Sequence, residues 1–400
     1  MASSSSSDSD RDERSAVWDF VVVGAGMAGA SVGWELAQQG ARVLLLEREE
    51  QPGYHSTGRS AALFMETYGT PQIRALTRAS RAFLQAPPAD FGTHGSVLAP
   101  RGVVYLAAPD QGDLLEQTCA ALHPHAPGLE RLDHAALMAR LPLLLRGEAV
   151  GAGLFEPGAA DIDVHALHQG YLRSLRQHGG RLRCNSEVVA LQRAAGVWTL
   201  ALQDGATLQA RHVVNAAGAW ADRLGQLAGA APIGLQPRRR SAFTFAAPAG
   251  LDVARLPALM AVDESFYIKP DAGQLLGSPA NADPVDAHDV QPEEIDIATG
   301  IYHIGQMTTL QIRRPSHTWA GLRSFVSDGD LVVGWDARAE AFLWVAAQGG
   351  YGIQSAPGYA LLARNLALGQ PVDARLQAEG VDAATLSPRR LQVQGGAASF

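Results

Sequence analysis

The first apolar run of the chain predicts a buried strand followed by a helix. Residues 18–23 are mostly apolar and rich in β-branched valine, which is typical of a parallel strand covered on both faces. Residues 28–39 then predict a helix, and Gly40 is placed to end it. A second short apolar run, residues 43–46, ends at Glu47. This order predicts a βαβ unit of about 30 residues, the size of a mononucleotide-binding half.

Beyond this unit, helical segments alternate with shorter strand-like segments, and no pattern repeats at a fixed period. We expect a Gly/Ser/Thr loop at 52–60, helices at 70–83 and 163–178, strands at 197–202, 210–215, 240–245 and 265–268, and a final helix that opens at 349–352 and runs to about 368. The strands after residue 240 alternate and contain aromatic residues, which favours an antiparallel sheet.

Segments of the two kinds interleave along the chain, so the fold class is α/β with two discontinuous domains. The boundaries we expect are a Rossmann-like nucleotide-binding domain at 17–85, 146–235 and 320–390, an α+β substrate domain with an antiparallel sheet at 86–145 and 236–319, and tails at 1–16 and 391–400.

Composition and charge exclude several classes of protein. With 47% hydrophobic and 18% charged residues, the 400-residue chain is globular, and its net charge of −8 counts against a nucleic-acid surface. The two cysteines form no C-x-x-C pair, so we expect no metal site and a reducing, cytoplasmic location. Residues 1–15 lack the apolar core of a signal peptide. The uncharged run 20–34 is too short and too glycine-rich for a membrane span.

The turn after the first strand matches the dinucleotide fingerprint G-x-G-x-x-G. Gly24 permits a tight turn, Gly26 allows the backbone to approach a pyrophosphate, and Gly29 allows the helix to pack on the strand. The helix N-terminus offers free N–H groups to the pyrophosphate. Glu47 would accept hydrogen bonds from ribose hydroxyls, which counts against NADP. The fingerprint by itself leaves FAD and NAD as alternatives.

Longer motifs separate these cofactors. The stretches GYHSTGRSAA (53–62), VNAAGAW (214–220), DESFYIKPD (263–271), TWAGLRSF (318–325) and QGGYGIQ (348–354) resemble FAD-dependent amine oxidoreductases of the D-amino acid oxidase superfamily. Within it, the chain is most similar to the bacterial FAD-dependent D-arginine dehydrogenases, from about residue 18 to about residue 390.

The resemblance implies FAD held without a covalent bond. It also implies hydride transfer from the substrate Cα to flavin N5, after which the imino acid hydrolyses to a 2-keto acid and ammonia. Electrons would pass to a quinone or another carrier. The cofactor-binding residues it implies are Gly24, Gly26, Met27, Ala28, Gly29, Glu47, Arg48, His55, Ser56, Arg59, Ser60, Ala61, Val188, Ala217, Gly218, Trp220, Gly349, Gly350, Tyr351, Gly352, Ile353 and Gln354.

The same resemblance assigns the catalytic residues. Arg323 matches the family arginine that holds the substrate carboxylate, a task suited to a planar guanidinium with two parallel donors. Arg240, Tyr267 and Tyr68 match further residues of the substrate pocket. Gly350 is placed at the start of the final predicted helix, with its backbone facing the substrate amine and the helix N-terminus facing the flavin.

The expected side-chain pocket departs from that of the D-arginine enzymes. Leu63 replaces a pocket histidine, Met65 and Met260 are bulky and apolar, and no acid occupies the position near Gly102 where the family grips a guanidinium. Burying a substrate guanidinium without an anionic partner is unfavourable by several kcal/mol. We therefore expect an apolar or aromatic D-amino acid as the small-molecule substrate. A pocket-facing Glu66 would restore basic substrates.

Several alternatives remain open at this stage. The chain could be a secondary-amine oxidase of the sarcosine type, a D-arginine or D-lysine dehydrogenase, or a flavin-dependent 2-hydroxyacid dehydrogenase, although the last would require a base that the matched positions lack. A flavin-bearing binding or electron-transfer subunit and an NAD-dependent dehydrogenase are less consistent with the retained arginines and with the single fingerprint.

Overall fold

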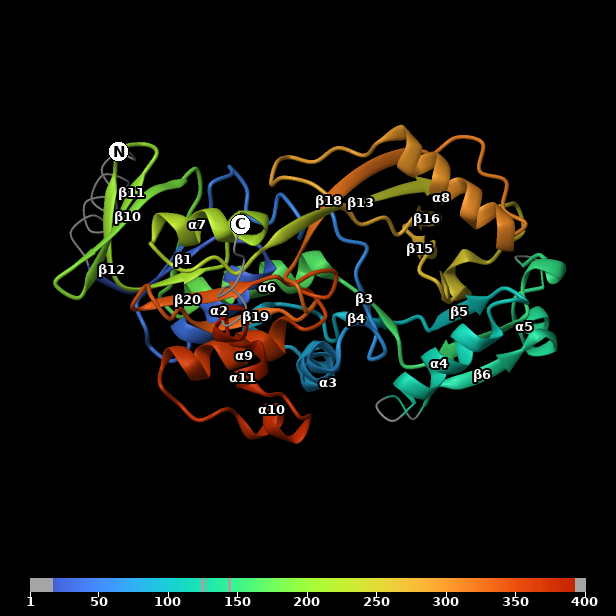
Figure 1. The fold of residues 1–400 in the computed structure, drawn as a ribbon, viewed down its shortest axis with the longest axis horizontal. Helices are drawn as coiled ribbons and strands as arrows, with labels where there is room; N and C mark the ends of the chain where they lie inside the picture. Colours follow the sequence, from blue (N-terminus) through green and yellow to red (C-terminus); the bar gives the residue numbers. More distant parts are fainter. Residues whose placement is uncertain (1–16, 124–125, 127, 143–144, 393–400) are drawn as a thin grey trace, which may run out of the picture.

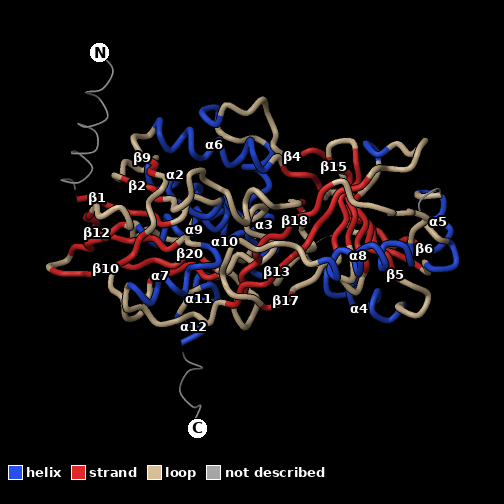
Figure 2. The backbone as a smooth tube through the Cα atoms, turned by 90° about the horizontal axis from the view of Figure 1, so that it is seen from above, coloured by secondary structure: helices blue, strands red, loops and turns tan. Residues whose placement is uncertain are grey.

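The structure is a computed structural model that describes residues 17–123, 126, 128–142 and 145–392. Two large sheets, one at each end of the molecule, are connected by strands and loops that cross between them (Figures 1 and 2). This mixed α/β architecture confirms the predicted fold class. The predicted tail 1–16 lies outside the described residues.

The first sheet has eight strands and a parallel centre. Its strands are β1 (Val17–Val23), β2 (Val43–Leu46), β9 (Arg181–Arg183), β10 (Val188–Ala194), β11 (Val197–Leu202), β12 (Thr207–Asn215), β19 (Val332–Trp335) and β20 (Phe342–Ala346). Strands β20, β12, β1, β2 and β9 lie side by side in parallel, while β10, β11 and β19 pair antiparallel. Strand β1 is central because both of its faces are apolar. Phe20 and Val22 join one core cluster, and Trp18, Val21 and Val23 join another.

Helices cover both faces of this sheet. The helices α2 (Met27–Ala37), α3 (Pro71–Gln85), α6 (Val164–Gln177) and α9 (Ala356–Ala367) pack together around one core cluster, and α7 (Ala221–Leu227) contributes to the other. Thr70 and Asp163 cap α3 and α6 with their side chains, as Ser/Thr/Asp residues do before helices.

The second sheet has nine strands and is mostly antiparallel. Its strands are β5 (Val103–Ala107), β6 (Glu130–Asp133), β7 (Ala152–Glu156), β13 (Gln236–Phe245), β14 (Ala258–Ala261), β15 (Tyr267–Asp271), β16 (Gln274–Ser278), β17 (Asp283–Pro284) and β18 (His317–Phe325). Within the described strands of this sheet, β5 and β14 form the one parallel pair. The helices α4 (Gly112–Leu122), α5 (His134–Arg140) and α8 (Glu294–Met307) flank it, and a small sheet of β3 (Leu63–Phe64), β4 (Leu98–Pro100) and β8 (Ala160–Ile162) lies beside it.

Two expectations about chain organisation differ from the structure. The expected boundary at 145/146 precedes β7, yet β7 pairs with β5 and β6 in the nine-stranded sheet. The expected helix start at 349–352 is wrong, because residues 349–355 form a run of turns and α9 begins at Ala356. Gly349 has a φ of +52°, outside the helical region, and Pro357 favours a start beside it. Short helices α10 (Ala374–Ala378), α11 (Ala383–Leu386) and α12 (Arg389–Gln392) follow α9.

Candidate functional site: a cavity between the two sheets

A large open cavity lies where the two sheets meet. It measures about 1650 Å³ with its mouth included, and its wall comes from both sheets and from the loop after β2. The predicted site residues that line it are Gly24, Gly26, Met27, Ala28, Glu47, Arg48, His55, Ser56, Arg59, Ser60, Ala61, Val188, Ala217, Gly218, Trp220, Arg240, Tyr267, Arg323, Gly349, Gly350, Gly352 and Ile353. The tertiary structure thus brings together residues from eight separate stretches of the chain.

The glycines of the fingerprint occupy positions that admit no larger side chain. Gly24 has a φ of +101°, and a Cβ there would lie 2.4 Å from the carbonyl oxygen of Ala216. A Cβ on Gly29 would lie 1.8 Å from the carbonyl oxygen of Gly24. Gly29 does not line the cavity. Its place is at the contact between α2 and the strand, where the packing argument puts it.

The cavity wall at the start of α2 presents hydrogen-bond donors and one carboxylate. Glu47 accepts from the backbone N–H of Ala25 at 3.0 Å through Oε2 and from that of Glu49 at 3.1 Å through Oε1. Among the described residues, the N–H groups of Gly26 and Ala28 have no hydrogen-bond partner, and both residues line the cavity. Free amides at a helix N-terminus are suited to bind a pyrophosphate.

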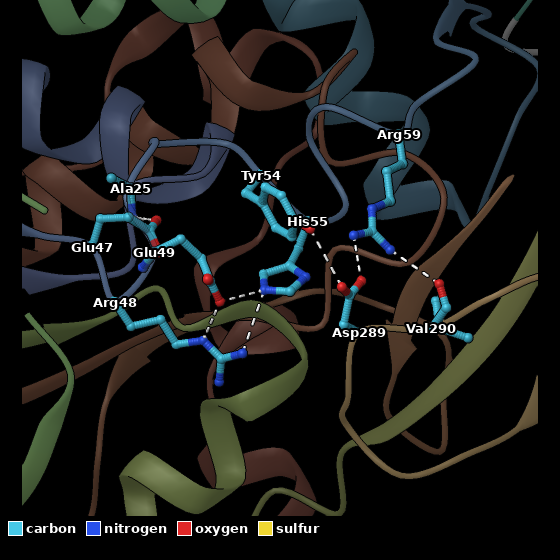
Figure 3. Close-up of polar contacts among 9 residues, drawn as sticks. All are labelled: Ala25, Glu47, Arg48, Glu49, Tyr54, His55, Arg59, Asp289 and Val290. Carbon is cyan, nitrogen blue, oxygen red and sulfur yellow. Dashed lines mark hydrogen bonds and ion pairs between the residues drawn. The ribbon is translucent and has the colours of Figure 1, made fainter. Parts of the chain in front are cut away.

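The loop after β2 closes one side of the cavity through a polar cluster (Figure 3). His55 Nε2 lies 2.8 Å from Glu49 Oε1, and the guanidinium of Arg48 contacts both side chains. Arg48 also stacks on the ring of Trp220, 3.9 Å from its centroid. We name the part of the cavity bounded by Gly24, Gly26, Glu47 and Trp220 the dinucleotide end.

A second contact joins this loop to the segment between β17 and α8. Arg59 forms an ion pair with Asp289 and donates to the carbonyl oxygen of Val290 at 3.1 Å, and the Tyr54 hydroxyl donates to Asp289 at 3.4 Å (Figure 3). Val290 is buried in a cluster that Trp220 packs against. The segment from the nine-stranded sheet is therefore fastened to the dinucleotide end.

At the other end of the cavity, two arginines lie on paired strands. Arg240 on β13 pairs in register with Gly321 on β18, two residues from Arg323. Tyr267 on β15 also lines this part of the cavity, and Tyr68, which follows β3, accepts a hydrogen bond from Arg323 Nη1 at 3.2 Å. We name the part bounded by Arg240, Arg323 and Tyr267 the arginine end; Tyr68 borders it through its contact with Arg323.

The two guanidinium groups of the arginine end have no acidic partner. Within the described ranges, no carboxylate lies within ion-pair distance of either, and Arg240 Nε donates only to the carbonyl oxygen of Asn281, at 2.6 Å. Burial and the nearby charge of Arg323 lower the pKa of Arg240 to about 10. For Arg323, burial opposes the charged form, but the phenol oxygens of Tyr68 and Tyr267 raise its pKa above the usual value. This end of the cavity is therefore a site for an anion.

Gly350 lies against both groups of this anion site. A Cβ there would lie 2.7 Å from Arg323 Nη1 and 2.9 Å from the Tyr68 hydroxyl, so a side chain would displace the arginine or the tyrosine. The expected helix N-terminus at Gly350 is wrong, because α9 begins six residues later. The groups that face the cavity here are backbone groups of a turn.

Several predicted site residues do not line the cavity. Gln354 is buried and exchanges hydrogen bonds with the backbone of Met65, and Tyr351 donates its hydroxyl to the carbonyl oxygen of Gly329. Leu63, Met65, Tyr68 and Met260 instead share an apolar cluster beside the arginine end. Gly102 does not belong to this cluster, and a Cβ there would meet the ring of Phe155. Glu66 lies in a turn rather than on a helix, and its Oε1 accepts from Arg81 Nε at 2.8 Å.

The structure also adds residues to the site. Thr57 Oγ1 accepts from the N–H of Met27 at 2.9 Å, and Trp319 Nε1 donates to the carbonyl oxygen of Arg59 at 3.0 Å. Both lie inside the motifs that carry the family resemblance. Ser186, Glu187, Arg223, Leu224, Leu227 and Gln348 line the cavity as well. Three of them lie within two residues of Val188 or Gly349 in the sequence. The other three follow Trp220 at the spacing of one helix face.

The fold and the cavity are those of a dinucleotide-binding α/β protein with two buried arginines at the other end of the cavity. Comparison with known proteins makes this specific: the profile of the DAO family, described as FAD dependent oxidoreductase, matches residues 19–366. The chain belongs to this family, and FAD is its cofactor.

Individual proteins of low sequence identity are similar to this chain as well. Rat (Rattus norvegicus) mitochondrial dimethylglycine dehydrogenase is 25% identical over 264 residues, and the match covers 65% of this chain but only 30% of that protein. Glycine oxidase from Geobacillus kaustophilus has a TM-score of 0.76 at 22% identity and covers 92% of this chain and 98% of its own. L-α-glycerophosphate oxidase from Mycoplasma pneumoniae, solved with FAD bound, has a TM-score of 0.78 at 18% identity and covers 88% and 95%. The similarity to these two solved structures shows a shared fold.

The residues present fit FAD. The glycine turn leaves backbone amides free, Glu47 supplies an acceptor for ribose hydroxyls, and the cavity continues from there to the arginine end. Within the described residues, no helix is long and apolar enough to cross a membrane, and no group of three or more His, Cys, Asp or Glu could hold a metal ion.

Proposed function

We propose that this protein oxidises the Cα–N bond of a D-amino acid with an apolar or aromatic side chain, releasing a 2-keto acid and ammonia. The observation that supports this most directly is the pair of guanidinium groups, Arg323 and Arg240, that share the cavity with the cofactor site and have no acidic partner among the described residues. A substrate carboxylate would supply the missing anion.

The residues of the arginine end would then orient the substrate. Arg323 would hold the carboxylate by two parallel hydrogen bonds, and the hydroxyls of Tyr68 and Tyr267 would fix its remaining oxygen positions. The backbone of Gly350 would face the amino group. When bound, FAD supplies the two-electron acceptor for the Cα–H bond. We propose that it is held without a covalent bond, since the His55 ring is engaged by Glu49 and Arg48.

The preference for an apolar side chain rests on what borders the arginine end. Leu63, Met65 and Met260 form an apolar cluster there, and the Glu66 carboxylate is paired with Arg81 rather than directed at the cavity. A substrate guanidinium would meet no partner in such surroundings.

The test is anaerobic reduction of the bound flavin by a panel of amino acids. We expect D-phenylalanine, D-methionine or D-leucine to bleach the flavin faster than D-arginine, D-lysine or any L-isomer. A preference for D-arginine would contradict the side-chain proposal, and reduction by L-isomers alone would contradict the handedness. Oxygen uptake compared with quinone reduction then tests the proposed quinone or other carrier as electron acceptor.

A second candidate is oxidation of a secondary or tertiary amine, as the name of the rat relative suggests. Its substrate would also carry a carboxylate and would use the same arginines. Reduction of the flavin by N-methylglycine or N,N-dimethylglycine, with no reduction by primary D-amino acids, would favour it.

A further inference from the structure

Glu156 is a buried carboxyl group that the proposed reaction does not use. It ends β7 and is 4% exposed. Its Oε1 accepts from the backbone N–H of Glu66 at 2.7 Å, and its Oε2 accepts from the hydroxyl of Thr67. The oxygen of that hydroxyl lies 2.7 Å from the hydroxyl of Tyr105, which is buried as well. The carboxyl group thus ends a short chain of hydrogen bonds.

These bonds hold the turn that carries Tyr68. On one side of the turn, Gln354 accepts from the N–H of Met65 at 3.1 Å and donates to its carbonyl oxygen at 3.3 Å. On the other side, Glu156 holds the next two residues. The turn ends at Tyr68, whose hydroxyl accepts from Arg323 at 3.2 Å. Two buried side chains outside the cavity therefore fix the position of one group of the anion site.

We propose that Glu156 is a positioning residue for substrate binding: as an anion it anchors the turn at residues 66 and 67 and so places the Tyr68 hydroxyl against Arg323. The inference rests on the proposed function, since it concerns how the arginine end binds a carboxylate.

The pattern of hydrogen bonds fits the anion. Thr67 has one hydroxyl hydrogen, which it donates to Glu156, so Tyr105 must donate its own hydrogen to Thr67. A protonated Glu156 would donate to Thr67 and reverse the chain. The hydroxyl hydrogen of Tyr105 would then have no acceptor within the part of the chain that the structure describes. A buried donor without an acceptor is unfavourable, so protonation loosens the turn.

The titration of Glu156 falls in an accessible range. Burial raises its pKa to about 7, against the lowering effect of the hydrogen bonds from Thr67 and from the Glu66 backbone. Of the charged groups that face it, the Glu66 carboxylate raises this pKa further and Arg81 lowers it. The anion is therefore present above about pH 7 and is lost below it. Carboxylate binding at the arginine end is expected to weaken as the pH falls.

The experiment measures the Kd of benzoate, a simple carboxylate that stays ionised across this range, from the shift of the flavin absorbance of the holoenzyme. For the wild type we expect the Kd to rise roughly tenfold between about pH 8 and about pH 6, the effect of losing one net hydrogen bond. The variant Glu156→Gln should bind benzoate weakly at both pH values. In a Tyr68→Phe background, Glu156→Gln should change nothing further.

Matched variants separate positioning from loss of folding. Glu66→Gln removes a neighbouring negative charge and leaves an amide oxygen that can still accept from Arg81, so it should keep the pH step and move it to lower pH. A step that survives in Glu156→Gln, or an effect of that substitution that is equal with and without the Tyr68 hydroxyl, overturns the inference. Flavin content and Tm report on folding in each variant.

The proposed function fails by a different result. If benzoate does not bind the wild type, or binds Arg323→Met equally well, the carboxylate site itself is contradicted. If binding depends on Arg323 but not on pH, only the role of Glu156 is contradicted.

Discussion

The two ends of the cavity differ in whether their charged side chains have protein partners. At the dinucleotide end, Glu47 accepts from backbone amides and Arg48 is paired with Glu49, and in the loop that closes this end Arg59 is paired with Asp289. At the arginine end, Arg323 and Arg240 lie on paired strands, and no acid among the described residues is within ion-pair distance of either. The difference indicates which ligand is permanent and which is transient.

A resident cofactor can be bound by groups that the fold has already oriented, because those groups never need to change partners. A substrate that arrives and leaves must bring the charge that completes its site. Each time it leaves, two guanidinium groups are again close together in a buried position, which is unfavourable. That unfavourable state raises the affinity for a carboxylate.

The largest effect is expected at the dinucleotide end, from Gly29→Ala. The added Cβ would overlap the carbonyl oxygen of Gly24 at 1.8 Å, and only backbone movement could relieve the overlap. We expect little or no FAD to remain per mole of protein after desalting. Gly33→Ala is the matched control on the same helix, since its Cβ would meet its nearest neighbours at 3.7 Å. It should keep FAD and stabilise the helix by up to about 1 kcal/mol. Normal FAD content in Gly29→Ala would contradict the packing argument.

A smaller but specific effect is expected at the arginine end, from Arg323→Met. The variant should keep its flavin and lose kcat/KM by roughly 1000-fold, because two charge-assisted hydrogen bonds to the substrate are removed. Arg323→Lys keeps the charge without the planar pair of donors, so its kcat/KM should lie between those of Arg323→Met and the wild type. Steady-state kinetics with the best substrate of the panel checks this. A loss of only a few-fold in Arg323→Met would place the substrate carboxylate elsewhere.

The smallest effect is expected where the second sheet is fastened to the cofactor loop, from Asp289→Asn. The carboxylate is about half exposed, so its pair with Arg59 contributes at most about 1 kcal/mol, and FAD should dissociate up to about fivefold faster. Release of flavin fluorescence after dilution measures the rate, and high salt should reproduce the effect in the wild type.

Arg59 holds the pKa of Asp289 below its usual value. The pair is therefore intact at neutral pH and is lost only as the pH falls into the acid range. A rate that is independent of both the substitution and salt would contradict this role.

Prediction from sequence succeeded where an element depends on its own residues. The strands β1, β2 and β11 and the helices α3 and α6 lie within two residues of their expected bounds, because apolar runs, caps and glycine stops are local signals. It failed at residues 349–355, where a glycine-rich turn precedes the helix and the positive φ of Gly349 and the position of Pro357 favour a start at Ala356. It also misassigned β7, whose apolar residues pair with β5 although α4, β6 and α5 lie between the two strands in the chain.

The candidate site divides in the same way. The fingerprint glycines and Glu47 were found because one short stretch of sequence specifies them. The role of Thr57 and the burial of Gln354 away from the cavity were not predicted, because each depends on a contact across tens to hundreds of residues. The role of Glu156 has no local signal, since its partners belong to a turn 90 residues earlier in the chain.

By itself, the sequence determined that a βαβ unit forms, that its glycine turn can admit a dinucleotide, and that the motifs resemble a flavin-dependent family. These properties follow from local conformational preference and from residue size, which act over a few positions. Only the tertiary structure decided that Arg323 and Arg240 face one cavity without an ion-pair partner among the described residues, and that buried side chains fix the turn that carries Tyr68. Charge pairing and burial depend on which distant strands become neighbours, and that depends on how the two sheets pack.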